Sequence, residues 1–349
     1  MSVDTQPDET DLIIPLPGEG DVWDPHTVHT HYFGFCVPEA AIGVFLYIRY
    51  MPYFPLCQGG VLAFQGLENL TTTDALFYDY EITMPWPDID GGRITTANGL
   101  TFDFVEPGRR AVLQYRSTDG RTSFDVTATA VTPLLARGHV IPGEEFHRSQ
   151  EPSGSEQFMR CTGTLTLHGE QYAVDSFYPR DHSWRQVRLE SRANNVHPPV
   201  SWTPIHLGED LTFNQIGIEA PDTDPDWAGI YEVPAGTPNH HYAWVVRNGQ
   251  IRGIDHVRRT VTKTHPLLFA PLAMQIEATD ETGESYEFSG EAIALSPMMM
   301  WPNIASFDSV FRWSDTSGRV AFSTVQTMHS EAYAHALKTR RPATAELVR

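Results

Sequence analysis

The chain has 349 residues, more than a single compact core usually holds, so we expect one large or two medium domains. Its 41% hydrophobic content supports a sizeable core and excludes an intrinsically disordered chain. Lysines and arginines number 24 against 44 aspartates and glutamates, and the formal net charge of −20 argues against nucleic acid or anionic membrane surfaces as partners.

The cysteines and the N-terminal stretch indicate the compartment. Cys36, Cys57 and Cys161 form neither a disulfide framework nor a CxxC pair, so we expect reduced thiols in a cytoplasmic protein. Residues 1–21 are acidic and contain proline, which is not the pattern of a signal peptide. No apolar run reaches the roughly 18 residues of a membrane span, so we expect no membrane insertion.

The first half of the chain has the pattern of β-strands joined by tight turns. Branched and aromatic residues dominate 41–51, and residues 75–84 alternate between two faces, as in a half-buried strand. We interpret residues 1–150 as an N-terminal β-barrel domain. Asn-Gly, Pro-Gly and Asp-Gly turn signals separate the strands that follow, at 98–99, 107–108 and 119–120.

The second half repeats this pattern after a polar stretch. Residues 136–157 are rich in glycine, proline and serine, and we interpret them as a linker or long loop. We assign 151–340 to a C-terminal β-barrel domain that ends in a short helix at 330–340, and 341–349 to a tail. Turn glycines again separate the predicted strands, at 168–169, 248–249, 282–283 and 317–318.

These patterns predict an all-β fold class. A long meander of strands must cover one apolar face and its edges, which it does by closing into a barrel or by packing as a sandwich. Two meanders of similar size follow one another here. We therefore expect two consecutive antiparallel β-barrels or half-barrels packed together.

Several common catalytic motifs are absent from the sequence. It has no GxGxxG after a strand, no P-loop and no GxSxG, which argues against a nucleotide-dependent enzyme and an α/β-hydrolase. His29 and His31 would share one face of a strand, as metal ligands do, and His26 lies nearby. No cysteine or HExxH motif accompanies them, so we interpret them as part of a polar loop and expect no metal.

Residues 178–188, YPRDHSWRQVR, form the densest run of chemically active side chains. In an extended strand, successive side chains point to opposite faces. One face would then carry Arg180, His182 and Trp184, and the other would carry Asp181, Ser183 and Arg185.

This run has two interpretations that require opposite protonation states of Asp181. In the first, Asp181 or His182 is a buried proton donor, held against an apolar wall of Tyr178 and Trp184. In the second, Asp181 is ionised between the flanking arginines, and these buried ion pairs fix the geometry between the two barrels. Spacing alone favours the second interpretation, since structural ion-pair networks also bring such residues together.

Aromatic and methionine side chains gather in two further stretches, YMPYFPLC at 50–57 and PMMMWPNIASF at 297–307. They belong either to the core or to the lining of an apolar ligand cavity, where methionine adapts to the shape of the ligand. For the second case, the candidate substrate-binding residues are Tyr50, Tyr53, Phe54, Met299 and Trp301, together with Tyr178 and Trp184.

The run DHSW, placed after the hairpin GTLTLHGEQYAVDSFYPR at 163–180, resembles the D-x-S-W signature of the AttH-like, hydroxyneurosporene-synthase-like proteins. The segment YFGFCVPEAAIGVFLYIRYMP at 32–52 adds to this resemblance. The family consists of lipocalin-like (calycin-type) double β-barrels that include carotenoid hydratases, and related folds occur in a prenylated-isoflavonoid hydratase and in cyclases. The resemblance covers most of the chain and implies two consecutive lipocalin-like barrels around an apolar ligand.

The resemblance favours the catalytic interpretation of the run, although the chain departs from the family at three positions. Relatives commonly carry arginine where His182 stands and glycine where Arg185 stands. They also often carry a glutamate where Gln326 stands, near the C-terminus. The signature positions in this sequence are Asp181, Ser183 and Trp184.

We therefore expect an enzyme that binds an apolar isoprenoid- or polyketide-like molecule in a cavity at the interface of the two barrels. Asp181 or His182 would protonate a C=C bond or remove a proton, while Tyr178 and Trp184 stabilise positive charge, without a cofactor. The reaction would be a hydration or dehydration by a lyase, an isomerisation or a cyclisation.

Two other functions stay open. A non-catalytic carrier of an apolar ligand would share the cavity and lack the proton donor. A polysaccharide-binding or -cleaving sandwich is a weaker option, because no paired-carboxylate signature is visible in the sequence. A homodimer also stays open, since nothing in the sequence decides the oligomeric state.

Overall fold

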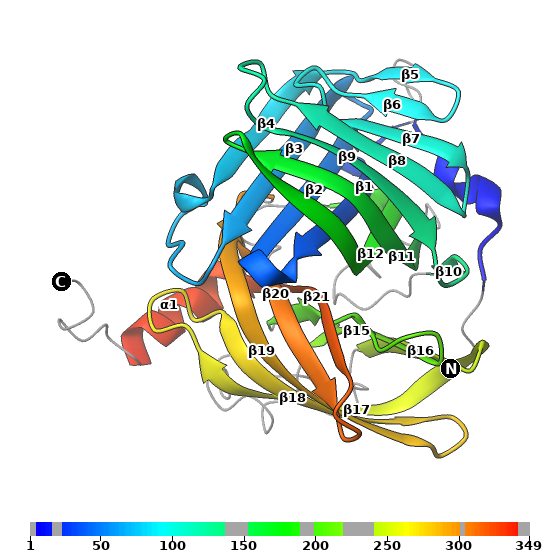
Figure 1. Ribbon diagram of the computed structural model, residues 1–349, viewed down its shortest axis with the longest axis vertical. Coiled ribbons are helices and arrows are strands. Elements are labelled where there is room, and N and C mark those ends of the chain that lie inside the picture. Colours follow the sequence, from blue (N-terminus) through cyan, green and yellow to red (C-terminus); the bar gives the residue numbers. More distant parts are fainter. Residues whose placement is uncertain are drawn as a thin grey trace.

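The computed structural model describes residues 5–15, 23–136, 153–188, 199–218, 241–300 and 304–340. Strands make up most of this part of the chain, and they form two antiparallel sheets (Figure 1). The all-β prediction is confirmed. The described helices are α1 (Glu331–Arg340), which matches the helix predicted at 330–340, and the short 3₁₀ helices η1 (Asp8–Leu12), η3 (Pro38–Ala40) and η4 (Thr72–Asp74).

The first sheet has the strand order β4-β3-β2-β1-β12-β11-β9-β8-β7-β6-β5, with β10 paired beside β11. The long hairpin β11–β12 therefore lies in the middle of the sheet, although it comes last in the sequence. Among the described residues, the end strands β4 and β5 do not pair with each other, so this sheet is an open, curled half-barrel (Figure 1). Its strands are β1 (Thr27–Val37), β2 (Ile42–Met51), β3 (Leu56–Gln65), β4 (Phe77–Pro85), β5 (Asp88–Asp90), β6 (Arg93–Thr95), β7 (Thr101–Glu106), β8 (Arg110–Arg116), β9 (Ser123–Ala130), β10 (Leu135–Ala136), β11 (Ser153–Leu167) and β12 (Glu170–Val187).

Aromatic side chains fill the concave side of the half-barrel. Phe33 and Phe35 on β1 reach Phe102 on β7 and Phe124 on β9, with ring centroids 4.9 and 5.5 Å apart. These strands are not neighbours of β1 in the sheet, so the contacts cross its interior. All four rings are buried, and the interior of the half-barrel is therefore packed with core side chains.

The second sheet has the strand order β13-β21-β20-β19-β18-β17-β16-β15-β14. An additional pairing between β13 and β15 joins its ends, so eight strands close into a barrel and β14 lies outside the ring. Buried side chains, including Phe213, Phe288 and Trp313, fill this barrel. The expected pair of packed barrels or half-barrels is confirmed, as one half-barrel and one closed barrel. The strands are β13 (Val200–Trp202), β14 (Ile205–His206), β15 (Leu211–Ile218), β16 (His241–Arg247), β17 (Gln250–Thr264), β18 (Pro271–Asp280), β19 (Ser285–Met298), β20 (Ile304–Asp315) and β21 (Val320–Ser330).

The change from one sheet to the other falls between Val187 and Val200, whereas the sequence placed it at residue 150. The reason is long-range pairing, because β12 pairs with β1 and β11 pairs with β9, so this hairpin completes the first sheet. Most of the linker predicted at 136–157 lies outside the described residues, and its last part belongs to β11. The division into separate domains at 150 and 340 stays a prediction.

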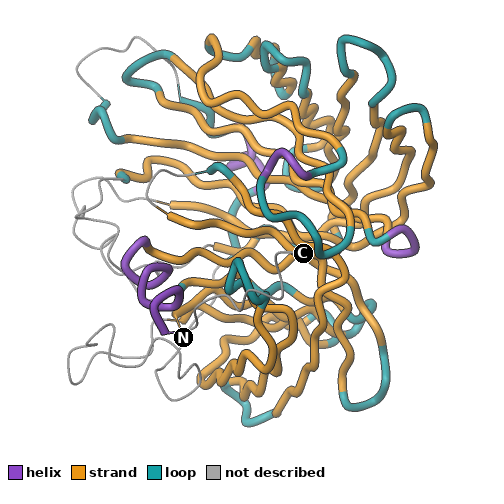
Figure 2. Tube along the Cα trace, turned by 90° about the vertical axis from the view of Figure 1, so that its left-hand side faces the viewer, coloured by secondary structure: helices purple, strands orange, loops and turns teal. Residues whose placement is uncertain are grey.

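The convex face of the half-barrel packs on the barrel, which lies below it in Figures 1 and 2. Gly43 on β2 permits a close approach, because a Cβ atom there would lie 2.5 Å from Phe64 and 2.7 Å from Val310 on β20. The Asn69 amide donates a hydrogen bond of 2.8 Å to the carbonyl of Leu295 on β19. Both sheets thus contribute to one buried interface.

The cysteines and the helices bear on two further expectations. Cys36, Cys57 and Cys161 are buried and unbridged, as expected. Burial raises the pKa of Cys57 and of Cys161 to about 12, so these thiols stay protonated near neutral pH. Within the described ranges, no helix has the length and apolarity needed to cross a membrane.

Candidate functional site

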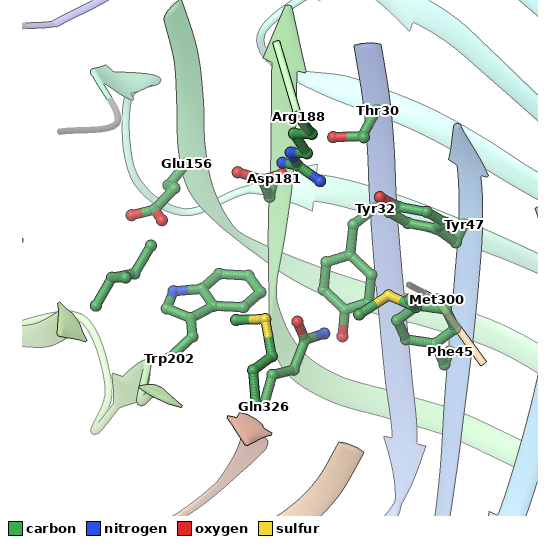
Figure 3. Close-up of a pocket in the computed structure, with 12 residues that line it drawn as sticks. Thr30, Tyr32, Phe45, Tyr47, Glu156, Asp181, Arg188, Trp202, Met300 and Gln326 are labelled. Atoms are coloured by element: carbon green, nitrogen blue, oxygen red, sulfur yellow. The ribbon is translucent and has the colours of Figure 1, made fainter. Parts of the chain in front are cut away.

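A cavity of about 70 Å³ lies between the half-barrel and the closed barrel (Figure 3). This volume is less than half of the ~150 Å³ at which an engineered apolar cavity holds benzene. The cavity therefore takes a very small molecule or the reacting end of a larger one. Its lining consists of Thr30, Tyr32, Phe45, Tyr47, Glu156, Asp181, Arg188, Trp202, Ile216, Met300, Gln326 and Met328.

Four of these side chains form a straight line across neighbouring strands of the half-barrel, which we call the polar row. Tyr47 on β2 is the Cα partner of Tyr32 on β1, which is in turn the partner of Asp181 on β12. Asp181 is the partner of Glu156 on β11. Directly opposed residues point to the same face of a sheet, so the polar row faces the barrel as one surface.

The barrel supplies the opposite wall of the cavity. Gln326 on β21 and Ile216 on β15 are both Cα partners of Trp202 on β13, at the seam where the barrel closes. Met300 and Met328 complete this wall. Apart from the Gln326 amide and the indole nitrogen, the wall is apolar. Figure 3 shows the indole ring beneath the two carboxylates of the polar row.

The polar row carries carboxylates on two directly opposed residues, Glu156 and Asp181. Cβ atoms of directly opposed residues lie about 4.5–5.5 Å apart, and like charges in this position destabilise a sheet. Arg188 lies beside Asp181 in Figure 3 and places a positive charge near the pair. Glu156 is 2% exposed, whereas Asp181 is half-buried. The pair thus combines one enclosed carboxyl with one that meets solvent.

The barrel fixes the position of Glu156. Asn214 Nδ2 on β15 donates a hydrogen bond to Glu156 Oε2. Asn214 Oδ1 accepts a hydrogen bond of 2.7 Å from Trp202 Nε1. The indole can only donate, so the Asn214 amide has one orientation between its two partners. These hydrogen bonds connect the carboxylate of the half-barrel with the aromatic wall of the barrel.

Arg180, in the YPRDHSWRQVR run, points into the half-barrel, away from the cavity. Its Nη1 and Nη2 donate hydrogen bonds of 2.6 and 2.9 Å to the carboxylate of Asp11 on η1. The predicted pairing of Arg180 with Asp181 is wrong, because these neighbours alternate to opposite faces of β12. Arg185, the other predicted partner, is exposed, with a φ of 53°. A buried ion pair is therefore present, but it joins Arg180 to Asp11 and holds η1 against the half-barrel.

His182 also lies on the inner face and does not line the cavity. Its ring stacks on that of His31 with 3.9 Å between centroids, and its Nε2 lies 3.2 Å from the carbonyl oxygen of Ile13. Burial lowers the pKa of His182 well below its usual range, and His31 and His29 lower it further. The ring is therefore neutral near pH 7. His182 lies on the opposite side of the sheet from the two carboxylates. Its catalytic role stays a prediction.

Three of the predicted substrate-binding residues are buried outside the lining. Trp184 is 7% exposed, and its ring centroid lies 4.9 Å from that of His182, on the inner face of the half-barrel. The hydroxyl of Tyr50 lies 3.1 Å from His31 Nδ1, inside the half-barrel. Tyr178 is 1% exposed and packs over Gly34. None of the three is part of the cavity wall.

The other predicted lining residues are exposed. Tyr53 and Phe54, in the turn between β2 and β3, are 47% and 52% exposed, and Met299 is 55% exposed. Met300, the next residue, enters the cavity instead. Trp301 lies outside the described residues. A role of these side chains in substrate binding stays a prediction.

Within the described part of the chain, no group of three or more histidine, cysteine, aspartate or glutamate side chains is arranged to hold a metal ion. His29 and His31 are buried on β1, and the expected polar loop is wrong at this position. Burial lowers the pKa of His29 to about 3 and that of His31 to about 4. Both are neutral core side chains near pH 7.

Sequence reasoning identifies Asp181 and misses most of the other lining residues. Glu156 falls in the predicted linker, and Trp202 carries no local signal. Gln326 stands out only as a departure from the AttH-like relatives. The predicted turn at 168–169 is the one available signal for Glu156, because the register of the β11–β12 hairpin opposes it to Asp181.

Comparisons with known proteins match the chain to a family and to a solved structure. No curated protein matches the chain. The crystal structure of kievitone hydratase from Nectria haematococca aligns with 88% of this chain and 90% of its own, at a TM-score of 0.47 and 12% sequence identity. Similarity at this level carries no information on activity, and the resemblance to the AttH-like proteins stays a prediction. Residues 20–330 match the family described as Domain of unknown function (DUF7064), and the chain therefore belongs to that family.

Proposed function

We propose that the protein is an enzyme that performs acid/base chemistry on a mostly apolar molecule held between the half-barrel and the barrel. The observation that carries this proposal is the cross-strand pair of Glu156 and Asp181 in a cavity whose facing wall is largely apolar. A largely apolar site disfavours two negative charges on directly opposed residues, so one of the two carboxyls can stay protonated there. One group then donates a proton while the other accepts one.

The chemistry that fits this pair is proton transfer at a carbon–carbon double bond. A proton from one carboxyl adds to the double bond and leaves a carbocation, and the faces of Trp202 and Phe45 stabilise its positive charge. Water adds to the cation and gives a proton to the other carboxylate. Dehydration follows the same path in reverse. Loss of a proton from a neighbouring carbon to the other carboxylate instead gives an isomerised alkene. Attack of a second double bond of the substrate on the cation, followed by that proton loss, gives a cyclised product.

The size of the cavity limits how much of a substrate it encloses. A volume of about 70 Å³ holds the reacting end of an isoprenoid- or polyketide-like molecule and not the whole of it. Asp181, Arg188 and Met328 are the half-buried members of the lining. We infer that the rest of the substrate passes these partly exposed side chains on its way to solvent.

The test begins with the purified protein, from which any co-purified small molecule is extracted, identified by mass spectrometry and followed for conversion. Asp181→Asn and Glu156→Gln keep the shape of the site and remove the transferable proton, so each should lower turnover about 10²–10⁴-fold. Asp175→Asn is the matched control, because Asp175 lies on the same strand and pairs with Arg160 at the surface. Unchanged turnover in both cavity variants would exclude the acid/base role.

A non-catalytic carrier is the second candidate. The hydrogen bond from Asn214 to Glu156 favours it, because a carboxylate that ties two sheets together can have a purely structural role. In that case Glu156→Gln should lower the unfolding temperature and leave the bound molecule chemically unchanged. A ligand that binds and is never converted, with or without either carboxylate, would identify a carrier.

A further inference from the structure

A group of buried polar atoms without hydrogen-bond partners lies beside the cavity. Among the described residues, Tyr32 Oη, Tyr178 Oη, Asp308 Oδ2 and Gln326 Nε2 make no hydrogen bond of good geometry. Thr324 lies near both hydroxyls, and Gln326 lies near that of Tyr32, without satisfying them. Each of these four side chains is at most 8% exposed. Buried polar atoms of folded proteins are nearly always satisfied by protein groups, ordered water or a ligand. Four of them in one place therefore indicate a shared binding partner.

These atoms come together from both sheets. Asp308 on β20 and Gln326 on β21 are Cα partners, so they point to the same face of the barrel. Figure 3 shows the Gln326 amide directed at the Tyr32 hydroxyl. Burial raises the pKa of Tyr32 and of Tyr178 well above the usual value, and the nearness of Asp308 is the next cause for both. Thr324 donates a hydrogen bond to Asp308 Oδ1, and Oδ2 is left for another partner.

The sequence makes room for this cluster at Gly34 on β1. A Cβ atom at this position would lie 2.6 Å from Tyr178 Cε1 and 2.7 Å from Tyr32 Oη. Any larger residue would therefore displace one or both tyrosine rings. The glycine is required here by the space that the two tyrosines occupy, so the cluster is a specific feature of the packing between the sheets.

We propose that these four side chains form a subsite that binds one neutral oxygen atom, either the hydroxyl or carbonyl oxygen of a ligand in the cavity or the water that reacts with it. Tyr32 and Gln326 also line the cavity, so the subsite is continuous with it. Two phenol hydroxyls and an amide can donate hydrogen bonds to such an oxygen. None of the four side chains is cationic, which argues against an anionic ligand. The subsite rests on the proposed function for the identity of the cavity as the ligand site.

Asp308 gives the subsite a dependence on pH. Burial raises its pKa to about 7, so near neutral pH it changes from a hydrogen-bond donor to an acceptor only. A carbonyl oxygen needs a donor, and its binding should therefore weaken as the pH rises through about 7. Other titratable groups near the cluster stay neutral there, because burial raises the pKa of Tyr32 (β1), Tyr178 (β12) and Cys161 (β11). The cavity is also lined by the ionisable side chains Glu156, Asp181 and Arg188, which lie on the opposite side of it from Gln326 in Figure 3.

Methionine methyl NMR on the intact chain tests the subsite, because Met300 and Met328 line the cavity and report its occupancy. The probes are 2-propanol, acetone and xenon, of which only xenon lacks an oxygen and enters purely apolar cavities. We expect Tyr178→Phe and Asp308→Asn to bind 2-propanol about two- to tenfold more weakly than wild type, and Tyr178→Phe to bind acetone more weakly by the same factor. Xenon should bind all of them equally. Tyr172→Phe, on the same strand as Tyr178, is the matched control and should change nothing.

The outcomes separate the subsite from the proposed function. Equal losses for xenon and 2-propanol, or no loss for 2-propanol, overturn the subsite. In wild type the affinity for acetone should fall above about pH 7, and Asp308→Asn should abolish this dependence. Should Asp308→Asn not fold, Tyr178→Phe decides alone, since it removes a single hydroxyl.

Water is the second source of the oxygen atom and needs its own measurement. If no probe, xenon included, shifts the Met300 and Met328 signals, the cavity is not a ligand site and the proposed function fails. Oxygen-17 relaxation dispersion then measures whether the subsite holds a long-lived water molecule. A long-lived water that is present in wild type and lost in Tyr178→Phe supports the subsite, and equal relaxation in both overturns it.

Discussion

Arg180 and Asp181 are adjacent on β12 but point to opposite faces of the sheet, and Arg180 has a structural role in the buried pair with Asp11. Arg180 is 2% exposed, and Asp11 supplies its counter-charge. Asp11→Asn should therefore lower the free energy of unfolding by about 3–5 kcal/mol, because it leaves a buried guanidinium unpaired. Asp8→Asn is the control, since Asp8 pairs with Arg109 at the surface and should contribute less than about 1 kcal/mol. Urea unfolding compares the two, and equal effects would contradict a structural role for the buried pair.

At the scale of elements, strand β1 makes the fold sensitive to acid. Burial lowers the pKa of His29 to about 3 and that of His31 to about 4, from a usual value of 6.5. The unfolded chain therefore binds protons first as the pH falls. The stability that the neutral rings contribute is present above pH 6.5 and is lost as the pH falls towards 4.

Replacing one ring tests this acid sensitivity. His31→Gln should lose less stability than wild type between about pH 7 and about pH 5, because one of the groups that must charge is gone. His26→Gln is the control, since His26 is exposed just before β1. Urea unfolding at both pH values measures the difference. The same pH dependence in wild type and in His31→Gln would rule out a contribution from the His31 ring.

The hairpin β11–β12 shows how much of the site the sequence could predict. The turn at His168 and Gly169 opposes Leu167 to Glu170, and counting outward from it places Glu156 opposite Asp181. The turn and Asp181 are both recognisable from sequence. The glycine, proline and serine residues within 136–157 are typical of a loop, so the sequence does not predict the strand that carries Glu156. For this reason the pair of carboxylates is not predicted either. Trp202 could not be predicted, because it meets the polar row only through packing between two sheets.

At the scale of the whole molecule, turn glycines predict the fold class well. Gly99, Gly108 and Gly120 have φ values of 89°, 72° and 68°, as tight turns between strands require. The pairing of strands that are distant in the sequence is not predicted by these turns. The contacts of β12 with β1 and of β13 with β15 depend on the burial of whole sheet faces, which local periodicity does not encode. For this reason the strand pairs that close the barrel, and the change of sheet after Val187, could not be predicted from the sequence.

The cavity exists only where the half-barrel and the barrel pack closely, and Gly43 permits that approach. A Cβ atom there would lie 2.7 Å from Val310 Cγ2, so Gly43→Ala should destabilise the fold by about 1–3 kcal/mol. Val310→Ala removes one of the clashing groups. The double variant should therefore be more stable than the sum of the two single effects predicts. Strictly additive effects in this double-mutant cycle would show that Gly43 does not limit the contact.

The two walls of the cavity are made at different times during translation. The polar row belongs entirely to the half-barrel, whose strands run without interruption from β1 to β12. The facing wall begins with Trp202 and is finished only by Met328 on β21, the last strand to emerge. In a growing chain, the residues of the polar row are therefore synthesised before those of the facing wall. The facing wall is complete only when β21 pairs with β13, so a chain that ends before β21 lacks an assembled cavity.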